Sequence, residues 1–321
     1  MPPEQPNRPR KSTRKEAPTP NRRYLAGHYP FRSHFLSLHG LRYHYLDEGS
    51  GPPVLMLHGN PTWSFYFRHL ICGLRDFCRV IVPDHMGCGL SDKPRPGGYD
   101  FRLQSRVDDL EALIDALGIR RGVTLVMHDW GGMIGMAWAV RHPRRVARLV
   151  ILNTAAFLPP GGKKLPLRLQ LVRRGGPLAA GAVLGLNLFA RAAVYMAPAR
   201  PLKPEIRQAL LAPYATPASR LATLWFVRDI PLSRCDPSYE LARRVDGGLK
   251  RFKNRPALIC WGAKDFVFDT DYLAAWRRRL PQAEVHVFKN AGHYLLEDAP
   301  QAVSARVRHF LQKNTGAVYR S

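Results

Sequence analysis

The sequence predicts a doubly wound α/β fold, in which helices cover both faces of a mostly parallel sheet. Six short apolar runs follow one another along the chain, each separated from the next by a stretch able to form a helix: PVLMLHG, RVIVPD, VTLVMHD, RLVILNT, ALICWG and EVHVFKN. Uninterrupted apolar runs of this length indicate strands that are buried on both faces. In such a sheet the active site lies beyond the carboxyl ends of the strands.

Two further strands are predicted before these runs. Residues 35–46, FLSLHGLRYHYL, alternate around His39 and Gly40, as two short antiparallel strands joined by a tight turn would. With this hairpin, the predicted sheet has eight strands.

The alternation of strand and helix breaks after LVILNTAAF. From about residue 158 to 253 there is no strand-like run, only Pro and Gly punctuation between helical segments rich in Leu, Ala and Arg. Strand-like sequence resumes at Arg255. We therefore expect a helical cap, residues 158–253, inserted between two parts of one core domain, residues 25–157 and 254–321.

The beginning of the chain predicts a basic tail. Residues 1–24 are rich in Pro and basic residues and contain no hydrophobic segment, so we expect a disordered tail rather than a signal peptide. The nearest approach to a transmembrane stretch, from Pro177, is interrupted by Arg191, so no membrane span is expected. Five cysteines without a CxxC pair fit a reducing compartment. The expected location is the cytoplasm, and peripheral association with a membrane stays open.

The formal net charge of +25 raises the question of an acidic partner. Most of this charge is arginine scattered through the chain, which is typical of a solvated face or of a compositional bias. An acidic surface or protein partner stays open, but no motif interleaves aromatic with basic residues, so no nucleic acid is expected. No His or Cys pair has metal-ligand spacing, and we expect neither a metal nor another cofactor.

One turn carries the clearest chemical signal. In residues 122–135, GVTLVMHDWGGMIG, an apolar run stops at His128 and Asp129, and two glycines then open a helical stretch. This is the strand-turn-helix setting of a nucleophile elbow, where many hydrolases carry a serine. A carboxylate is already ionised at neutral pH, so Asp129 needs no base to activate it and suits displacement at a saturated carbon.

Three other segments complete a catalytic set. Asp265 in WGAKDFVFD is a candidate orienting acid, and His293 in NAGHYLLEDA follows the last strand. The order of nucleophile, acid and histidine is that of the α/β-hydrolase triad. In HGNPTW, Asn60 supplies a backbone N–H and a side-chain amide beside the elbow, and Trp130 adds an indole N–H. Together they predict a nucleophile that faces donors for a departing anion.

At these motifs the sequence resembles the haloalkane dehalogenase group of α/β-hydrolases, over essentially the whole chain after the tail. The matching segments are HGNPTW, PDHMGCGLSDKP, HDWGGMIG, WGAKDFVFD and AGHYLLED. The resemblance implies that Asp129 is the nucleophile and that Trp130 and Asn60 hold the leaving halide. Some relatives carry the acid after the preceding strand, but that strand here ends in LNTAAF, which leaves Asp265 as the acid in a matching place.

A closer resemblance, carried by LNTAAF, GCGLSDKP, FVRDIPL and DFVFD, is to the β-lactone decarboxylases of bacterial long-chain olefin biosynthesis. It implies conversion of a cis-3-alkyl-4-alkyloxetan-2-one to a cis-alkene and carbon dioxide through an Asp129 alkyl-enzyme intermediate. The apolar cap would suit two alkyl chains. The expected partner is a small apolar, long-chain substrate, and a complex with other pathway enzymes stays open.

Three alternatives remain at this stage. The same triad would serve a haloalkane dehalogenase, in which His293 activates water against the Asp129 ester and the backbone N–H groups of Asn60 and Trp130 form the oxyanion hole. Tyr195 and Tyr214 could protonate an epoxide oxygen, as in an epoxide hydrolase, although HGNP carries an amide where those enzymes usually have an aromatic side chain. A non-catalytic ligand-binding protein on this fold is the third.

Overall fold

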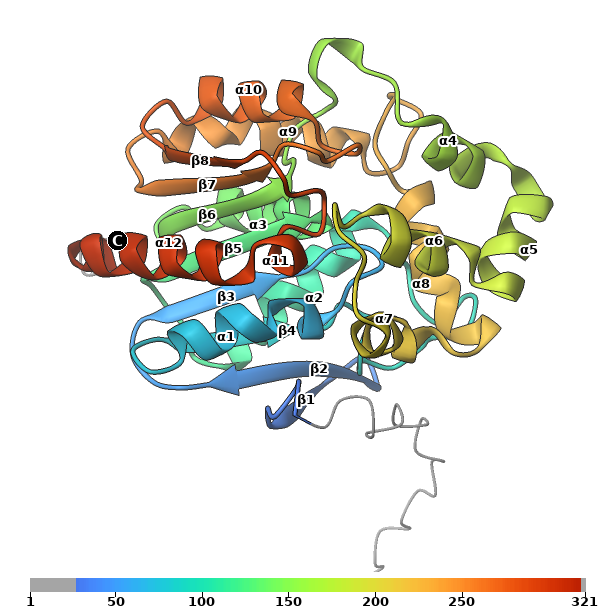
Figure 1. Cartoon of the computed structure of the whole chain (residues 1–321), viewed down its shortest axis with the longest axis horizontal. Helices are drawn as coiled ribbons and strands as arrows, with labels where there is room; N and C mark the ends of the chain where they lie inside the picture. Colours follow the sequence, from blue (N-terminus) through green and yellow to red (C-terminus); the bar gives the residue numbers. More distant parts are fainter. Residues whose placement is uncertain (1–26, 319–321) are drawn as a thin grey trace, which may run out of the picture.

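The computed structural model describes residues 27–318 and contains, within them, the eight predicted strands in one sheet. Their spatial order is β1-β2-β4-β3-β5-β6-β7-β8 (Figure 1). β2 pairs antiparallel with both β1 and β4, and the remaining neighbours are parallel. The predicted fold class is therefore confirmed. The strands are β1 (Ser33–Leu38), β2 (Leu41–Glu48), β3 (Pro53–Leu57), β4 (Arg79–Pro83), β5 (Val123–Asp129), β6 (Val146–Thr154), β7 (Ala257–Gly262) and β8 (Glu284–Phe288).

The first hairpin turns where the sequence predicts. His39 and Gly40 have φ angles of 50° and 76°, the left-handed backbone that a two-residue hairpin loop requires. β5 and β6 are buried along their whole length, which agrees with their continuous apolar sequence. The predicted tail, residues 1–24, lies outside the described residues.

Helices cover both faces of the sheet, and each face has its own apolar core. On one face α1 (Arg68–Leu74) packs against α12 (Pro300–Lys313), with α11 (Leu295–Asp298) beside them. The other face carries α2 (Leu103–Ala116), α3 (Trp130–Arg141), α9 (Tyr239–Gly248) and α10 (Thr270–Arg279). Short 3-10 helices are η2 (Ser64–Phe67), η3 (Pro160–Gly162), η4 (Ala212–Tyr214), η5 (Pro217–Arg220), η6 (Leu249–Phe252) and η7 (Thr315–Val318).

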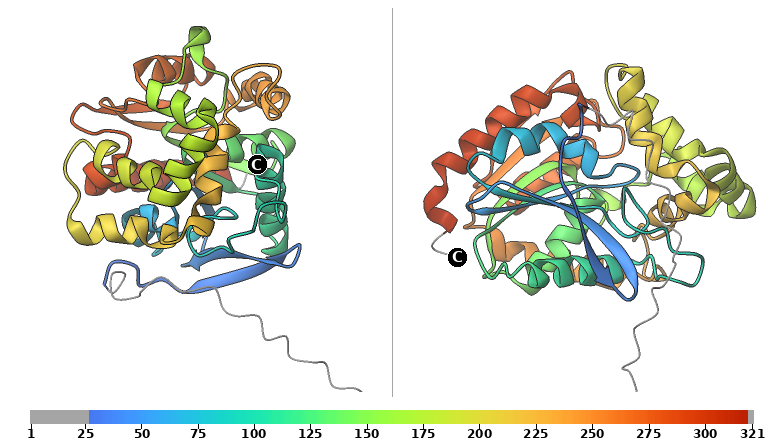
Figure 2. Two further views of the ribbon diagram at one scale, coloured as in Figure 1. Left: turned by 90° about the vertical axis from the view of Figure 1, so that its right-hand side faces the viewer. Right: turned by 90° about the horizontal axis from the view of Figure 1, so that it is seen from below.

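A group of helices between β6 and β7 lies over the carboxyl end of the sheet (Figures 1 and 2). It comprises α4 (Leu167–Arg174), α5 (Gly176–Leu186), α6 (Leu188–Met196), α7 (Pro204–Leu211) and α8 (Leu221–Arg228). No helix within the described residues is by itself long and apolar enough to cross a membrane. α5 and α6 together reach that length and apolarity, but the chain bends by 72° between them.

The expected end of the cap at residue 253 needs a correction. α9 and η6 pack against α3, and Arg279 of α10 pairs with Asp246 of α9 at 2.8 Å. By these contacts α9 belongs to the helical layer that covers the sheet. The helices over the carboxyl end of the sheet therefore end with α8, about one helix earlier than the sequence pattern suggests.

Candidate active site

Asp129 lies at the sharp turn between β5 and α3. Its φ of 50° and ψ of −123° are a strained conformation for a residue with a side chain, as expected of a nucleophile elbow. Gly131 and Gly132 let α3 approach the sheet closely, because an added Cβ would lie inside 3.0 Å of the Leu57 carbonyl oxygen and of Thr154 Oγ1. The Thr154 hydroxyl also donates a hydrogen bond to the Asp129 carbonyl oxygen. These contacts hold the elbow in place.

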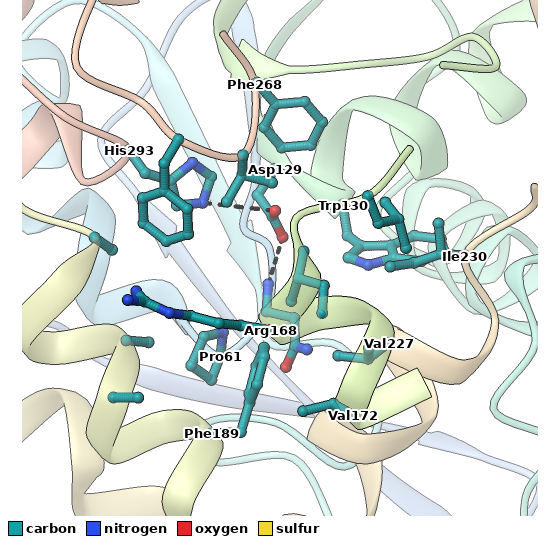
Figure 3. A pocket seen from close by; sticks show the side chains of 18 of the residues that line it. Pro61, Asp129, Trp130, Arg168, Val172, Phe189, Val227, Ile230, Phe268 and His293 are labelled. Atoms are coloured by element: carbon teal, nitrogen blue, oxygen red, sulfur yellow. Dashed lines mark hydrogen bonds and ion pairs between the residues drawn. The ribbon is translucent and has the colours of Figure 1, made fainter. Parts of the chain in front are cut away.

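The three predicted triad residues come together at this turn, and Figure 3 shows two of them, Asp129 and His293. Asp265 Oδ2 lies 2.8 Å from His293 Nδ1, and His293 Nε2 lies 3.6 Å from Asp129 Oδ2. All three side chains are buried, and Asp129, the most exposed residue of the three, is 8% exposed. The order of contact is therefore acid, histidine and elbow carboxylate.

A backbone donor binds the other oxygen of the elbow carboxylate. The Asn60 backbone N–H donates to Asp129 Oδ1 at 2.7 Å. Burial raises the pKa of Asp129 above its usual value, while the His293 charge and the backbone N–H groups of Asn60 and Trp130 partly oppose the rise. The backbone donors predicted for an oxyanion hole thus contact this carboxylate in the resting structure.

His293 is the titratable group beside this carboxylate. Burial lowers the pKa of His293, but the charge and hydrogen bond of Asp265, together with the charge of Asp129, outweigh this effect and raise the pKa overall. The imidazole therefore binds its proton more tightly than a free histidine does. His128 Nε2 lies 2.9 Å from the His293 carbonyl oxygen, so His128 contacts the backbone of the triad histidine rather than its ring nitrogens.

Asn153 is a site residue that the sequence analysis missed. This buried residue near the end of β6 donates from Nδ2 to Asp265 Oδ2 at 2.9 Å and to the Gly262 carbonyl oxygen at 3.1 Å. Its Oδ1 accepts the Gly262 N–H at 2.7 Å. Asp265 Oδ1 accepts two further N–H groups, from Val267 and Phe268. A polar residue at the carboxyl end of a buried strand was the available signal for Asn153.

The two predicted leaving-group donors differ in their surroundings. The Asn60 side-chain amide donates to the Thr223 carbonyl oxygen of α8 at 2.9 Å, which leaves one of its two N–H groups uncommitted. The Trp130 indole packs against Phe226, with ring centroids 5.3 Å apart, and its N–H has no hydrogen-bond partner among residues 27–318. The indole is therefore the freer donor.

A cavity of about 510 Å³ opens above the Asp129 carboxylate. Asn60, Trp130 and His293 share its lining with Asp129, and apolar side chains from α4, α5, α6, α8 and the loop after β7 complete it. Representative lining residues are Val172, Val183, Phe189, Met196, Val227 and Phe268. At roughly 30 Å³ for each water-sized group, the cavity holds on the order of 17 such groups. It thus suits a ligand larger than a short haloalkane.

Several other polar residues near the carboxyl ends of the strands lie outside the lining of this cavity. Asp84, His85, Asp92, His58 and His128 do not line it. Asp84 accepts the backbone N–H groups of Ser64 and Leu90, so its carboxylate has a structural role. No cluster of three His, Cys, Asp or Glu side chains within residues 27–318 has the geometry of a metal site.

The two tyrosines considered as proton donors for epoxide opening also lie outside the cavity lining. Tyr195 is 68% exposed on α6, and Tyr214 is buried with its hydroxyl donating to the Thr62 carbonyl oxygen at 3.3 Å. Neither lines the cavity. The prediction that Tyr195 and Tyr214 protonate an epoxide oxygen is therefore wrong. Helical periodicity does not reveal which face of a cap helix points toward the cavity.

The sheet order, the elbow and the acid-histidine pair define an α/β hydrolase with aspartate at the nucleophile position. The family model described as alpha/beta hydrolase fold matches residues 52–300, and the chain belongs to this family. It is 50% identical over 283 residues to the cis-3-alkyl-4-alkyloxetan-2-one decarboxylase of Shewanella oneidensis, covering 88% of this chain and 89% of the relative. Identity to the enzyme of the same name from Xanthomonas campestris is 45% over 282 residues, covering 86% and 94%.

Haloalkane dehalogenases are more distant relatives. Haloalkane dehalogenase 2 of Mycobacterium tuberculosis is 34% identical over 285 residues, covering 87% of this chain and 94% of the relative. Among solved structures, a putative ancestral haloalkane dehalogenase superposes with a TM-score of 0.81 at 27% identity, covering 88% and 99%. The resemblances drawn from the sequence motifs are thereby confirmed.

Proposed function

We propose that this chain is a β-lactone decarboxylase that converts a cis-3-alkyl-4-alkyloxetan-2-one to a cis-alkene and carbon dioxide. The observation that carries the proposal is the Asp129 carboxylate at the base of a large apolar cavity, with Oδ1 on a backbone donor and Oδ2 beside His293. The similarity to two decarboxylases, at 50% and 45% identity, favours the lactone over a halide.

In the first step Asp129 Oδ2 attacks the saturated ring carbon that is bonded to the ring oxygen, not the carbonyl carbon. The bond between that carbon and the ring oxygen breaks, and the ring oxygen becomes part of a carboxylate on the neighbouring carbon. The free indole N–H of Trp130 and the uncommitted amide N–H of Asn60 are donors for this developing anion. The product of this step is an alkyl ester of Asp129.

In the second step the bond between the carboxylate and its carbon breaks, and its electron pair forms the alkene. The bond between Asp129 and the other carbon breaks at the same time, which regenerates the Asp129 carboxylate and releases carbon dioxide. Inversion in the first step followed by anti elimination gives net syn loss, so a cis lactone yields a cis alkene. No water is consumed.

This reaction gives His293 a role that differs from base catalysis. Its charge lowers the pKa of Asp129 against the effect of burial, so it favours the ionised form that attacks and is later expelled. Asp265 holds the imidazole for this purpose through a contact of 2.8 Å to Nδ1, and Asn153 holds Asp265 in turn through a hydrogen bond of 2.9 Å. Asp265 and Asn153 are accordingly positioning residues.

The cavity indicates a small apolar substrate with long chains. Its volume of about 510 Å³ lies within the usual range of ligand sites, and nearly all of its lining is apolar. We further propose a cytoplasmic location, which the five free cysteines support. Association with other pathway enzymes belongs to the same proposal, since an insoluble substrate needs a route to the cavity.

Haloalkane dehalogenation is the second candidate. The unpartnered Trp130 indole N–H would also serve a departing halide, and the similarity to solved haloalkane dehalogenases favours this candidate. In that reaction His293 would activate water against the Asp129 ester.

The test offers the purified protein a cis-dialkyl β-lactone and, separately, a bromoalkane of similar length. We expect alkene and carbon dioxide from the lactone and negligible bromide release. Fast bromide release with an inert lactone would establish the second candidate instead. Asp129→Ala should abolish either activity, and inertness of the wild type toward both substrates, with tight binding of the lactone, would indicate a non-catalytic ligand-binding protein.

A further inference from the structure

Most of the exposed large apolar side chains lie on three consecutive cap helices. Within the described residues nine such side chains are exposed, and six of them are on α4, α5 and α6, where between 55% and 88% of each residue is exposed. We call these six residues the cap patch. They are Leu167, Leu171, Leu178, Leu186, Leu188 and Tyr195.

The same segment carries positive charge without any negative charge. From Trp130 to Pro204 the sequence contains no Asp or Glu. Lys163 and Arg173 reach acidic residues outside the segment. Between residues 158 and 204, six exposed cations have no ion-pair partner among residues 27–318: Lys164, Arg168, Arg174, Arg191, Arg200 and Lys203. The segment that carries the cap patch therefore bears unpaired positive charge and no negative charge.

The cap patch also borders the entrance of the active-site cavity. Leu171 and Leu188 are both exposed and part of the cavity lining, and Arg168 lies at the same edge. α4 and α5 lie at the side of the molecule farthest from the sheet, and this side faces the viewer in the left panel of Figure 2. A flat surface that contacted these helices would cover the route into the cavity.

We propose that the cap patch docks on the surface of an anionic lipid bilayer. The leucines would enter the boundary between headgroups and acyl chains, and these cations would contact anionic headgroups, as in helices that lie in a membrane interface. Because no acidic residue lies between Trp130 and Pro204, two copies of this surface would bring like charges together, whereas anionic headgroups complement the cations. This charge pattern favours lipid over a second copy of the chain or another protein.

Docking in this orientation places the cavity entrance against the acyl chains. An apolar substrate then passes from the bilayer to Asp129 without crossing water. Only the identity of this substrate rests on the proposed function, because the docking surface itself is defined by exposure and charge.

Vesicle flotation of the full-length protein tests the proposal. Vesicles of phosphatidylcholine are compared with vesicles that contain about 30% phosphatidylglycerol, because anionic lipid supplies the expected attraction. We expect binding to the anionic vesicles, with at least about tenfold weaker partitioning to the neutral ones. Raising the salt from about 0.1 to about 1 M shortens the screening length from about 10 to about 3 Å and should weaken binding severalfold.

Matched variants locate the surface. Leu167→Ser, Leu178→Ser and Leu186→Ser together remove three patch residues that do not line the cavity, and we expect binding to fall at least about tenfold. The control, Phe35→Ser with Val287→Ser, removes exposed apolar side chains from β1 and β8 and should bind as the wild type does. Leu178→Asp, at the most exposed site, serves as a single-residue version if the triple variant unfolds.

Charge variants give an independent readout. Lys164→Gln with Arg174→Gln should weaken binding to anionic vesicles about threefold or more. Arg120→Gln with Arg121→Gln makes the same charge change between α2 and β5, away from the cap, and should leave binding unchanged.

Two results would overturn the proposal. One is the absence of wild-type binding to anionic vesicles. If the wild type then self-associates and Leu178→Asp abolishes that association, the cap patch binds a second copy of the chain instead. The other is equal loss of binding in the cap variants and their controls. Because flotation requires no turnover, failure of the lactone reaction alone leaves the docking result intact.

Discussion

Replacing Gly59 by alanine should disable the site by pushing the nucleophile aside. Gly59 follows β3 and passes directly against the elbow, so an added Cβ would lie well inside 3.0 Å of Asp129 Oδ1 and of the Asp129 carboxyl carbon. Real Cβ atoms do not approach other atoms this closely. The carboxylate, which the Asn60 N–H binds at 2.7 Å, would have to move by about 1 Å.

A displacement of about 1 Å in a reacting group costs on the order of 10²-fold in rate. Overpacking of a tight contact costs about 1–3 kcal/mol of folding free energy, which lowers the melting temperature by several degrees in a protein of this size. We therefore expect kcat to fall about 100-fold on the lactone, with little change in KM because the apolar cavity is untouched. Steady-state kinetics and thermal unfolding measure the two effects.

Gly181→Ala is the matched control. Gly181 lies in α5, and an added Cβ there meets no atom within 4 Å. This variant should keep wild-type kinetics and gain slight stability, because alanine favours helix more than glycine does. If Gly59→Ala retained activity within about threefold, the packing argument for the elbow would be refuted.

Three further predictions concern the charges and hydrogen bonds of the site. Asp129→Asn should lower turnover at least about 10⁴-fold. It should also raise the melting temperature at neutral pH. The raised pKa of Asp129 stabilises the fold of the wild type at low pH, and this stability is lost as pH rises through the folded-state pKa. The difference in melting temperature between the variant and the wild type should therefore widen as pH rises. His293→Gln removes the charge that lowers the pKa of Asp129, so the acid limb of the kcat/KM profile should move to higher pH; an unchanged limb would argue against coupling between the two groups. Asn153→Ala leaves the buried Gly262 N–H without a partner and removes a donor from Asp265 Oδ2, and it should cost about 2–4 kcal/mol in a denaturant titration, whereas a cost below about 1 kcal/mol would contradict the assigned hydrogen bonds.

The sheet and the triad could be predicted because their signals are local. A strand buried on both faces must be apolar throughout, as β5 and β6 are, so the runs stand out in the sequence. Asp129, Asp265 and His293 follow such runs, and the carboxyl ends of parallel strands meet at one edge of the sheet.

Other features depend on contacts between distant segments. Asn153 supports Asp265 only because β6 lies beside β7, and the bond from the Asn60 amide to Thr223 depends on how α8 sits over the sheet. Helical periodicity likewise says that α9 has an apolar face but not that this face packs on α3. These contacts become visible only when the chain is folded.

The fate of water oxygen tests the central claim most directly. The protein turns over the cis lactone many times in water enriched in oxygen-18, and the peptide containing Asp129 is then weighed by mass spectrometry. Decarboxylation regenerates Asp129 by cleavage of its bond to the substrate carbon, so the account predicts an unlabelled carboxylate. Incorporation of oxygen-18 into Asp129 during lactone turnover would contradict it, because that label enters only when water attacks the ester carbonyl.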